Sequence, residues 1–90
     1  MSDGTTERLR TVFAGLVRQP GELEALLQGA TIENALTLDS IGYLEMVMAV
    51  EREFGLQFDF EQLDAAFQTL ATLAAFLRSA RHGTPNRADP

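Results

Sequence analysis

The clearest pattern of apolar and polar positions in the chain lies between residues 40 and 54. Apolar side chains recur there at steps of three and four residues, which places them on one face of an α-helix. These residues are Tyr43, Met46, Val47, Val50 and Phe54. Asp39 or Ser40 can cap the first turn, and Gly55 suits the left-handed residue that ends many helices. The pattern therefore predicts a helix from about Ser40 to Phe54 with one face in a core.

A second flank of this predicted helix is also apolar. At about 100° per residue, Ile41, Leu44 and Met48 lie next to the core face. Glu45 and Arg52 lie beside them. One small helix cannot easily bury both flanks, so two interpretations stay open. Either the helix is central and mostly buried, with its first residue as an ordinary cap, or the second flank is exposed and binds partners.

The N-terminal part of the chain predicts another helix. Helical spacing begins after Thr5 or Thr6, and we expect a threonine to cap this helix and the Gln19-Pro20-Gly21 turn to end it. Gly15 falls inside the pattern, where a glycine weakens a helix by up to about 1 kcal/mol relative to alanine. Close contact with another helix would explain a glycine at this position.

The segment before the central helix is weakly patterned. Residues Glu22 to Gln28 hold enough leucines for one or two helical turns. From Ala30 to Leu38 no helical stripe is convincing, so we expect a long ordered loop that ends at the central helix. Long loops in compact domains are commonly functional or disordered. The apolar residues that we expect to hold this loop to the core are Ile32, Leu36 and Leu38.

The C-terminal half predicts two more helices. Residues Leu56 to Phe60 alternate apolar and polar, as a strand does, but the chain offers no second strand to pair with them. We therefore expect an extended loop there, followed by a short helix from Glu61 to Ala66. Thr69 can cap a last helix that ends near Arg78 to Arg81, and residues 82–90, which lack an apolar anchor, predict a disordered tail.

The expected fold is a small all-α bundle of four helices, with a short third helix and a long loop between the first two. Residues 1–81 would form one helical domain and residues 82–90 the tail. Ninety residues lie near the lower size at which one hydrophobic core suffices without staples. The chain has no cysteine, which excludes disulfides and thiolate zinc sites, so its stability must come from helix packing.

Charge narrows the range of partners. With 7 basic and 13 acidic residues the chain has a net charge of −6, which disfavours nucleic acids and anionic membranes and favours partners with basic surfaces. The first residues lack the basic start and apolar centre of a secretion signal, and no apolar run is long enough to span a bilayer. We expect a cytoplasmic protein and a monomer.

The sequence offers little for catalysis of its own. A serine nucleophile needs a base, and the only histidine, His82, lies in the predicted tail. There is no glycine-rich phosphate loop and no histidine pair for a metal, and acidic residues at helix starts are typical of solvated faces. We expect no catalytic residue and no metal site. Ser40 suits modification by another enzyme, because a phosphodiester on its oxygen would lie at the positive end of a helix.

The central segment resembles a known family. Acyl carrier proteins have an Asp-Ser-Leu signature followed by a helix, and the chain resembles them in Leu38-Asp39-Ser40-Ile41, in Leu44-Glu45-Met46-Val47-Met48-Ala49-Val50-Glu51 and in Glu53-Phe54-Gly55. Asp-Ser-Ile alone is a weak motif, and the long register behind it gives the specificity. The order of elements agrees from Thr5 to Arg81, and single residues match over Leu36–Gly55 and more loosely over Thr69–Leu77.

The resemblance implies a function for Ser40. Acyl carrier proteins receive 4′-phosphopantetheine from coenzyme A at the serine of this motif, and the terminal thiol of this arm carries an acyl group as a thioester. Ser40 would hold the arm, and Asp39 would help the transferase and its metal to dock. The expected partners are a phosphopantetheinyl transferase and the enzymes that load and transfer the acyl group. The residues expected to dock them are Ile41, Leu44, Glu45, Met48 and Arg52.

Three positions depart from the carriers of fatty-acid synthesis. Gly42 stands where those carriers often have an acidic residue, and Arg52 replaces another acidic residue. Both changes reduce the negative charge of the docking flank, which favours polyketide or other specialised biosynthesis over primary fatty acid biosynthesis. Tyr43 is bulkier than the usual residue there, and we expect a core aromatic with its hydroxyl near the surface.

Two other functions stay open. Peptidyl or aminoacyl carrier proteins of the same fold commonly have a Gly-Gly pair before the serine region, where this chain has Thr37-Leu38-Asp39-Ser40. An unmodified helical adaptor would use the second flank for protein interaction without any arm. The leading prediction is a discrete acyl carrier protein, which is a substrate shuttle for partner enzymes and not itself an enzyme.

Overall fold

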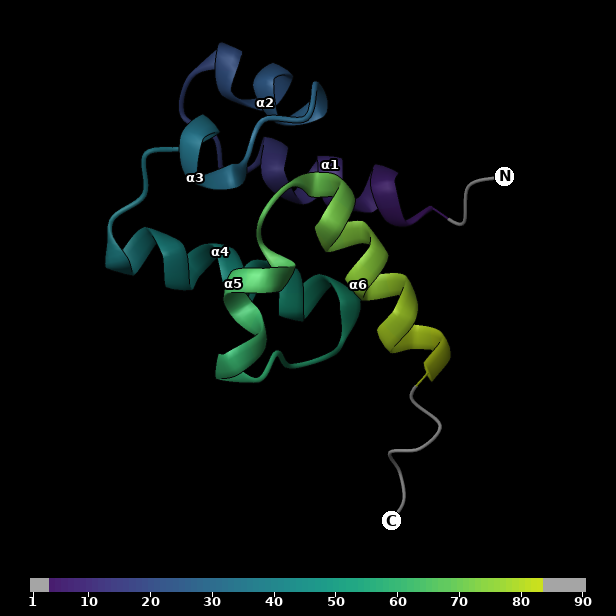
Figure 1. Ribbon diagram of the computed structural model, residues 1–90. Helices are drawn as coiled ribbons and strands as arrows, with labels where there is room; N and C mark the ends of the chain where they lie inside the picture. The colour runs from purple at the N-terminus through teal and green to yellow at the C-terminus, as the bar shows by residue number, and fades with distance from the viewer. Residues whose placement is uncertain (1–3, 84–90) are drawn as a thin grey trace.

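The computed structural model describes residues 4–83 of the chain, with side chains up to Ala80. All regular structure in this range is helical, which confirms the all-α prediction (Figure 1). The elements in chain order are α1 (Thr5–Ala14), α2 (Pro20–Leu27), α3 (Ile32–Ala35), α4 (Ser40–Phe54), the 3₁₀ turn η1 (Phe60–Gln62), α5 (Leu63–Ala66) and α6 (Leu70–Gly83). Within the described residues, no helix has both the length and the apolar character needed to cross a bilayer.

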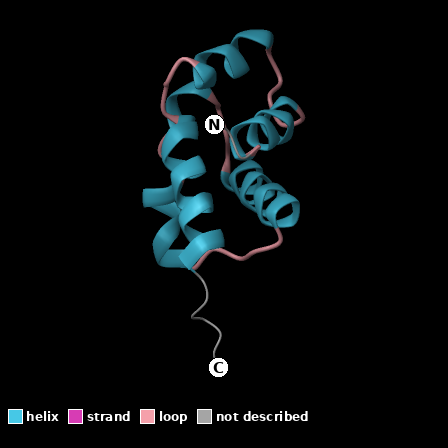
Figure 2. Ribbon diagram, turned by 90° about the vertical axis from the view of Figure 1, so that its right-hand side faces the viewer, coloured by secondary structure: helices cyan, strands magenta, loops and turns pink. Residues whose placement is uncertain are grey.

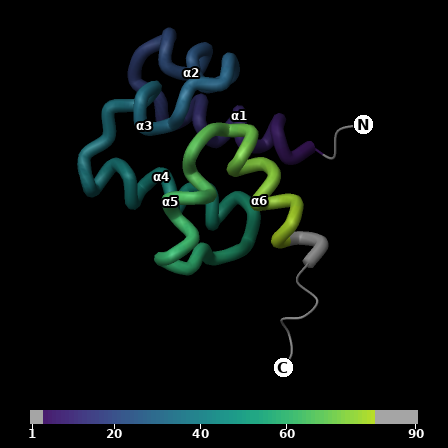
Figure 3. Tube along the Cα trace, in the orientation of Figure 1, coloured from purple at the N-terminus to yellow at the C-terminus, as the bar shows by residue number. Residues whose placement is uncertain are grey.

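The bundle is organised around α1, which packs against both α6 and α4 (Figure 1). Every regular element drawn in Figure 2 is a helix. α2 and α3 lie together at one end of the bundle, and α5 packs on α6 (Figure 3). Every α-helix contributes to one core. Its buried apolar residues are Leu9, Phe13, Leu26, Ile32, Leu36, Met46, Val47, Val50, Ala66, Phe67, Leu70, Leu73, Ala74 and Leu77. Burial of these side chains is the main favourable term that holds α4 in place.

The predicted central helix is confirmed at both ends, because α4 runs from Ser40 to Phe54. At its C-terminus Gly55 adopts the left-handed conformation, with φ of 67°, and its N–H donates to the carbonyl of Glu51 at 2.8 Å. A residue with a Cβ would be strained at this φ, which is why a glycine ends the helix. Of the predicted core face, the middle residues Met46, Val47 and Val50 are buried, whereas Tyr43 and Phe54 at its ends are half-buried.

The threonine cap and the end predicted for the first helix are both wrong. Gly4 holds the cap position of α1 with a left-handed φ of 85°, and Thr5 is the first helical residue. The Thr5 side chain is fully buried, so it belongs to the core and not to a cap. The helix ends at Ala14, before the predicted turn, and Gly15 is its C-cap. A Cβ at Gly15 would meet only the carbonyl of Val12, at an ordinary 3.5 Å, so no close helix contact explains this glycine.

The long loop predicted between Ala30 and Leu38 contains a helix, α3. Thr31 caps it by accepting the N–H of Asn34 at 3.2 Å, and the Ile32 N–H donates to the carbonyl of Gln68 at 2.8 Å. One helical turn is too short to give a hydrophobic stripe, so the periodicity missed it. Two of the three predicted anchors, Ile32 and Leu36, are buried, and Leu38 is half-buried.

The C-terminal elements follow the prediction more closely. The segment after Gly55 is an extended loop, and the Phe58 N–H donates to the Glu51 carboxylate at 2.9 Å. The short helix begins as η1 and continues as α5, and Thr69 accepts the N–H of Thr72 at 3.1 Å at the start of α6. Of the predicted tail, residues 82 and 83 instead belong to the α6 backbone, so the tail boundary at 82 is wrong, and residues 84–90 lie outside the described residues.

Candidate functional site

Ser40 is the first residue of α4, and its side chain is exposed. The sequence left open whether Asp39 or Ser40 caps this helix. The structure assigns the cap to Asp39, whose carboxylate accepts the N–H of Gly42 at 2.7 Å. The Ser40 hydroxyl has no hydrogen bond with any other described residue. Its oxygen is therefore available to solvent and to another enzyme.

Gly42 gives this cap the room that it needs. A Cβ at Gly42 would lie 3.2 Å from the cap oxygen of Asp39 and 3.3 Å from a methyl carbon of Leu38, both tighter than ordinary contacts. The absent side chain lets the carboxylate and the leucine approach the first turn together. The departure from an acidic residue at this position thus has a local structural reason in this chain.

A cavity of about 780 Å³ opens beside Ser40, between α3, the first half of α4 and the η1–α5 segment. This volume lies in the range of small-molecule sites, about 300–1,000 Å³. The buried residues Ile32, Leu36 and Phe67 line it on the side of the core. Exposed polar residues, among them Glu33 and Asp64, also line it. The sequence analysis missed this cavity, because α3 and α5 approach α4 only in the folded chain.

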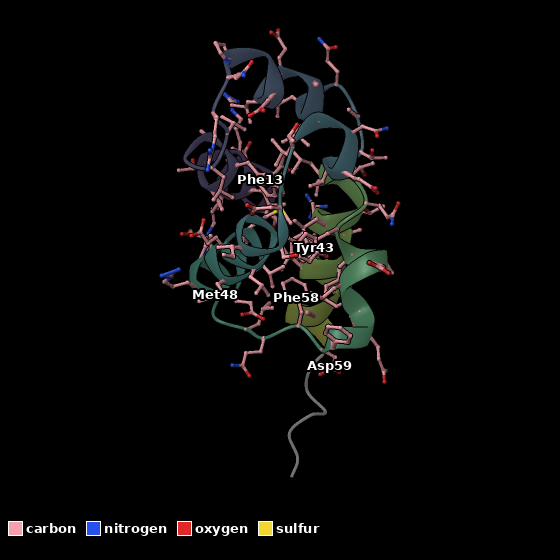
Figure 4. The ribbon with its side chains drawn as sticks, turned by 90° about the vertical axis from the view of Figure 1, so that its left-hand side faces the viewer. Phe13, Tyr43, Met48, Phe58 and Asp59 are labelled. Atoms are coloured by element: carbon pink, nitrogen blue, oxygen red, sulfur yellow. The ribbon has the colours of Figure 1, made fainter. Side chains whose placement is uncertain are left out.

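Tyr43 contributes to the lining of the same cavity. Its ring contacts Phe67, with the ring centroids 6.2 Å apart and the planes inclined at 59°. Phe67 in turn meets Phe58 edge-on, at a centroid distance of 5.0 Å. Burial, and next the negative charge of Asp64, raise the pKa of the Tyr43 hydroxyl above its ordinary value. Tyr43 is half-buried, as a core aromatic with its hydroxyl near the surface should be (Figure 4).

The second flank of α4 is exposed. Its three apolar side chains are Ile41, 68% exposed, Leu44, 55% exposed, and Met48, 53% exposed. Glu45 and Arg52 are exposed beside them, and Met48 lies on the outer side of the helix in Figure 4. The interpretation of α4 as a mostly buried helix is therefore wrong. We call these five residues the α4 flank.

Phe60 is a site residue that the sequence analysis did not single out. It is 88% exposed and lines the cavity from η1. The alternation in residues 56–60 was its only signal, and that pattern does not say which side chains end in solvent. No group of three histidine, aspartate or glutamate side chains in the described part of the chain is placed to hold a metal ion.

Fold and site define a class: a small helical bundle with an exposed serine at the start of a central helix, beside a cavity. The comparison with protein families identifies the class further. The family model described as phosphopantetheine attachment site matches residues 7–77. The chain therefore belongs to the family of phosphopantetheine-binding carrier proteins, as the sequence resemblance predicted, and its cofactor is covalently attached 4′-phosphopantetheine. The chain matches no curated protein and no solved structure.

Proposed function

We propose that Ser40 is the residue that holds the 4′-phosphopantetheine arm and that the protein is an acyl carrier. The observation that carries this proposal is that Ser40 is the only serine in the matched residues 7–77. It is exposed, and because Asp39 holds the cap, modification of its oxygen breaks no hydrogen bond of α4. The arm, once attached, supplies a thiol that forms a thioester with the acyl group.

The start of α4 suits the phosphodiester that joins the arm to the serine. The first N–H groups of a helix have no partner inside the helix, and the N–H groups of Ser40 and Ile41 belong to this set. A helix of 15 residues also has a macrodipole with its positive end here, which favours an anion. The described residues thus fit the cofactor: they offer the oxygen, an electropositive helix end and an adjoining cavity.

We also propose that the α4 flank docks the partner enzymes. Its apolar residues lie beside the charged residues Glu45 and Arg52, and a net charge of −6 favours partners with a basic rim. These partners would be a phosphopantetheinyl transferase and the enzymes that load and transfer the acyl group. Binding should be brief, since the carrier has to leave each enzyme, and the chain itself then acts as a shuttle and not as a catalyst.

What supports acyl over aminoacyl cargo is the apolar lining of the cavity and the absence of a Gly-Gly pair before the serine. Gly42 and Arg52, which lower the negative charge of the docking flank, favour polyketide or other specialised biosynthesis. The mass of the native thioester on protein from its source would test both assignments. An amino acid on the arm would contradict the assignment of acyl cargo. A saturated fatty acyl chain would contradict the assignment to polyketide or other specialised biosynthesis.

The attachment is tested by intact mass after incubation with coenzyme A and a broad-specificity phosphopantetheinyl transferase. The wild-type chain should gain one arm and Ser40→Ala none. Ser79, exposed on α6 and outside the matched residues, provides the matched control, and Ser79→Ala should gain one arm like the wild type. An arm on Ser40→Ala would contradict the assignment of the residue. No gain by any of the three proteins would favour an unmodified adaptor.

A further inference from the structure

The cavity beside Ser40 has a floor and a rim of different chemistry. Its floor is made of apolar side chains that are almost fully buried, such as Ile32 at 2% exposure and Leu36 at 4%. Its rim carries exposed polar groups, including the carboxylates of Glu33 and Asp64. A ligand that fills this cavity therefore needs an apolar part for the floor and a polar part nearer to the opening.

Tyr43 lies between the floor and the rim. It follows Ser40 by three residues, so the two side chains lie on the same side of α4, and both line the cavity. Its ring leans on Phe67, which belongs to the floor. Asp64 on the rim lines the same cavity, and its negative charge adds to burial in raising the pKa of the Tyr43 hydroxyl.

The Tyr43 hydroxyl is a hydrogen-bond donor that lacks an acceptor within the described residues. Because burial and Asp64 raise its pKa, the hydroxyl keeps its proton at neutral pH. An alkyl chain laid over it would displace its water and offer no acceptor, which is unfavourable for a half-buried polar group. A chain with an oxygen at this point would restore the lost hydrogen bond.

Resting on the proposed attachment at Ser40, we propose that Tyr43 is a specificity-determining residue that selects acyl chains with a keto or hydroxyl oxygen near the thioester over saturated chains of equal length. The apolar floor, with Ile32 and Leu36, takes the hydrocarbon part of such a chain. The Tyr43 hydroxyl donates a hydrogen bond to its oxygen. The cargo class is therefore a partly reduced, oxygen-bearing acyl thioester.

The test compares octanoyl, 3-oxooctanoyl and 3-hydroxyoctanoyl groups on the same protein. Each is loaded from its coenzyme A thioester by a broad-specificity transferase, and loading is verified by intact mass. The rate at which hydroxylamine cleaves each protein-bound thioester is then divided by the rate for the same acyl group on free coenzyme A. This ratio removes differences in intrinsic reactivity between the acyl groups. Both oxygenated groups should be protected more than octanoyl by about twofold to tenfold, the range that one net hydrogen bond corresponds to.

Two variants separate the hydroxyl from the shape of the cavity. Tyr43→Phe removes only the oxygen and should abolish the difference between oxygenated and saturated cargo. Leu63→Met, a change of similar volume in the same lining that adds no donor, should preserve it. Tyr43 is the only tyrosine, and there is no tryptophan, so its fluorescence reports on the site directly. Its emission should change on loading of oxygenated cargo and not on loading of octanoyl.

The protein with an unacylated arm is the remaining control, because the amides of the arm also carry oxygens. A complete fluorescence change with the bare arm would assign the hydroxyl to those amides and overturn the inference. Equal protection of all three groups, or a difference that survives in Tyr43→Phe, would overturn it too. If the proteins are loaded and all three groups are equally protected, this inference fails but the assignment of the attachment to Ser40 stands. If the protein gains no mass, both the assignment and this inference fail.

Discussion

Two neighbouring positions of α4 should respond in opposite ways to truncation. Val50 is fully buried in the core, and Met48, two residues earlier, is 53% exposed on the α4 flank. Val50→Ala removes core contacts and leaves the flank intact. Met48→Ala removes part of the proposed docking surface and leaves the core intact. The pair therefore separates the stabilising face of the helix from its binding face.

The sizes of the two effects follow from burial. Val50→Ala removes two methyl groups at about 0.8 kcal/mol each and adds a cavity term, for a loss of about 2–3 kcal/mol in the free energy of unfolding. In a domain of this size about 1 kcal/mol shifts Tm by roughly 4–8 °C, so Tm should fall by roughly 8–24 °C. Met48→Ala is a surface change, and it should alter stability by less than about 0.5 kcal/mol.

The assay combines thermal unfolding, followed by circular dichroism, with the initial rate of arm transfer to Ser40 at low protein concentration. Met48→Ala should keep its helicity and its Tm and lose most of the transfer rate. Val50→Ala, measured well below its lowered Tm, should keep the rate. A large drop in Tm for Met48→Ala would mean that the flank is part of the core, and an unchanged transfer rate would refute its role in docking.

Three further predictions concern single contacts of the site. Asp39→Ala should cost about 1 kcal/mol of unfolding free energy in urea denaturation through loss of the helix cap, with Asp39→Asn costing less; equal costs would deny the capping role. Glu51→Ala should speed amide exchange at Phe58, whose N–H it accepts, and unchanged exchange would contradict this hydrogen bond. The pKa of the Tyr43 hydroxyl is raised in the folded state, so folding is favoured while this hydroxyl keeps its proton. This contribution to stability is complete below the pKa of the unfolded chain and is lost as the pH rises through the folded pKa. Stability should thus fall more steeply in alkaline solution for the wild type than for Tyr43→Phe, and Asp64→Asn should lower the pH at which tyrosinate absorbance appears.

Elements that depend on local chemistry could be predicted from the order of residues alone. The step of three and four residues fixed the extent of α4, and Gly55 fixed its end, because left-handed backbone strains any residue with a Cβ. The same spacing of about 100° per residue put Val50 on the core face and Met48 on the second flank, although the exposure of that flank came only from the structure. The serine of the motif also needed no structure to be found.

The surroundings of that serine, by contrast, depend on contacts between distant segments and became known only from the folded chain. α3 is a single turn that is held by a hydrogen bond from the Ile32 N–H to the Gln68 carbonyl. All of α4 lies between these two residues in the sequence, so no local window contains both. The choice of Gly4 over a threonine as the cap of α1 came from burial of Thr5, which depends on packing against other helices. The cavity is lined by residues of α3, the start of α4 and the η1–α5 segment, which are far apart in the sequence and are brought together only by the fold. Local periodicity places a side chain on one face of its own helix. The distances between the faces of different helices are set by how all the helices pack together.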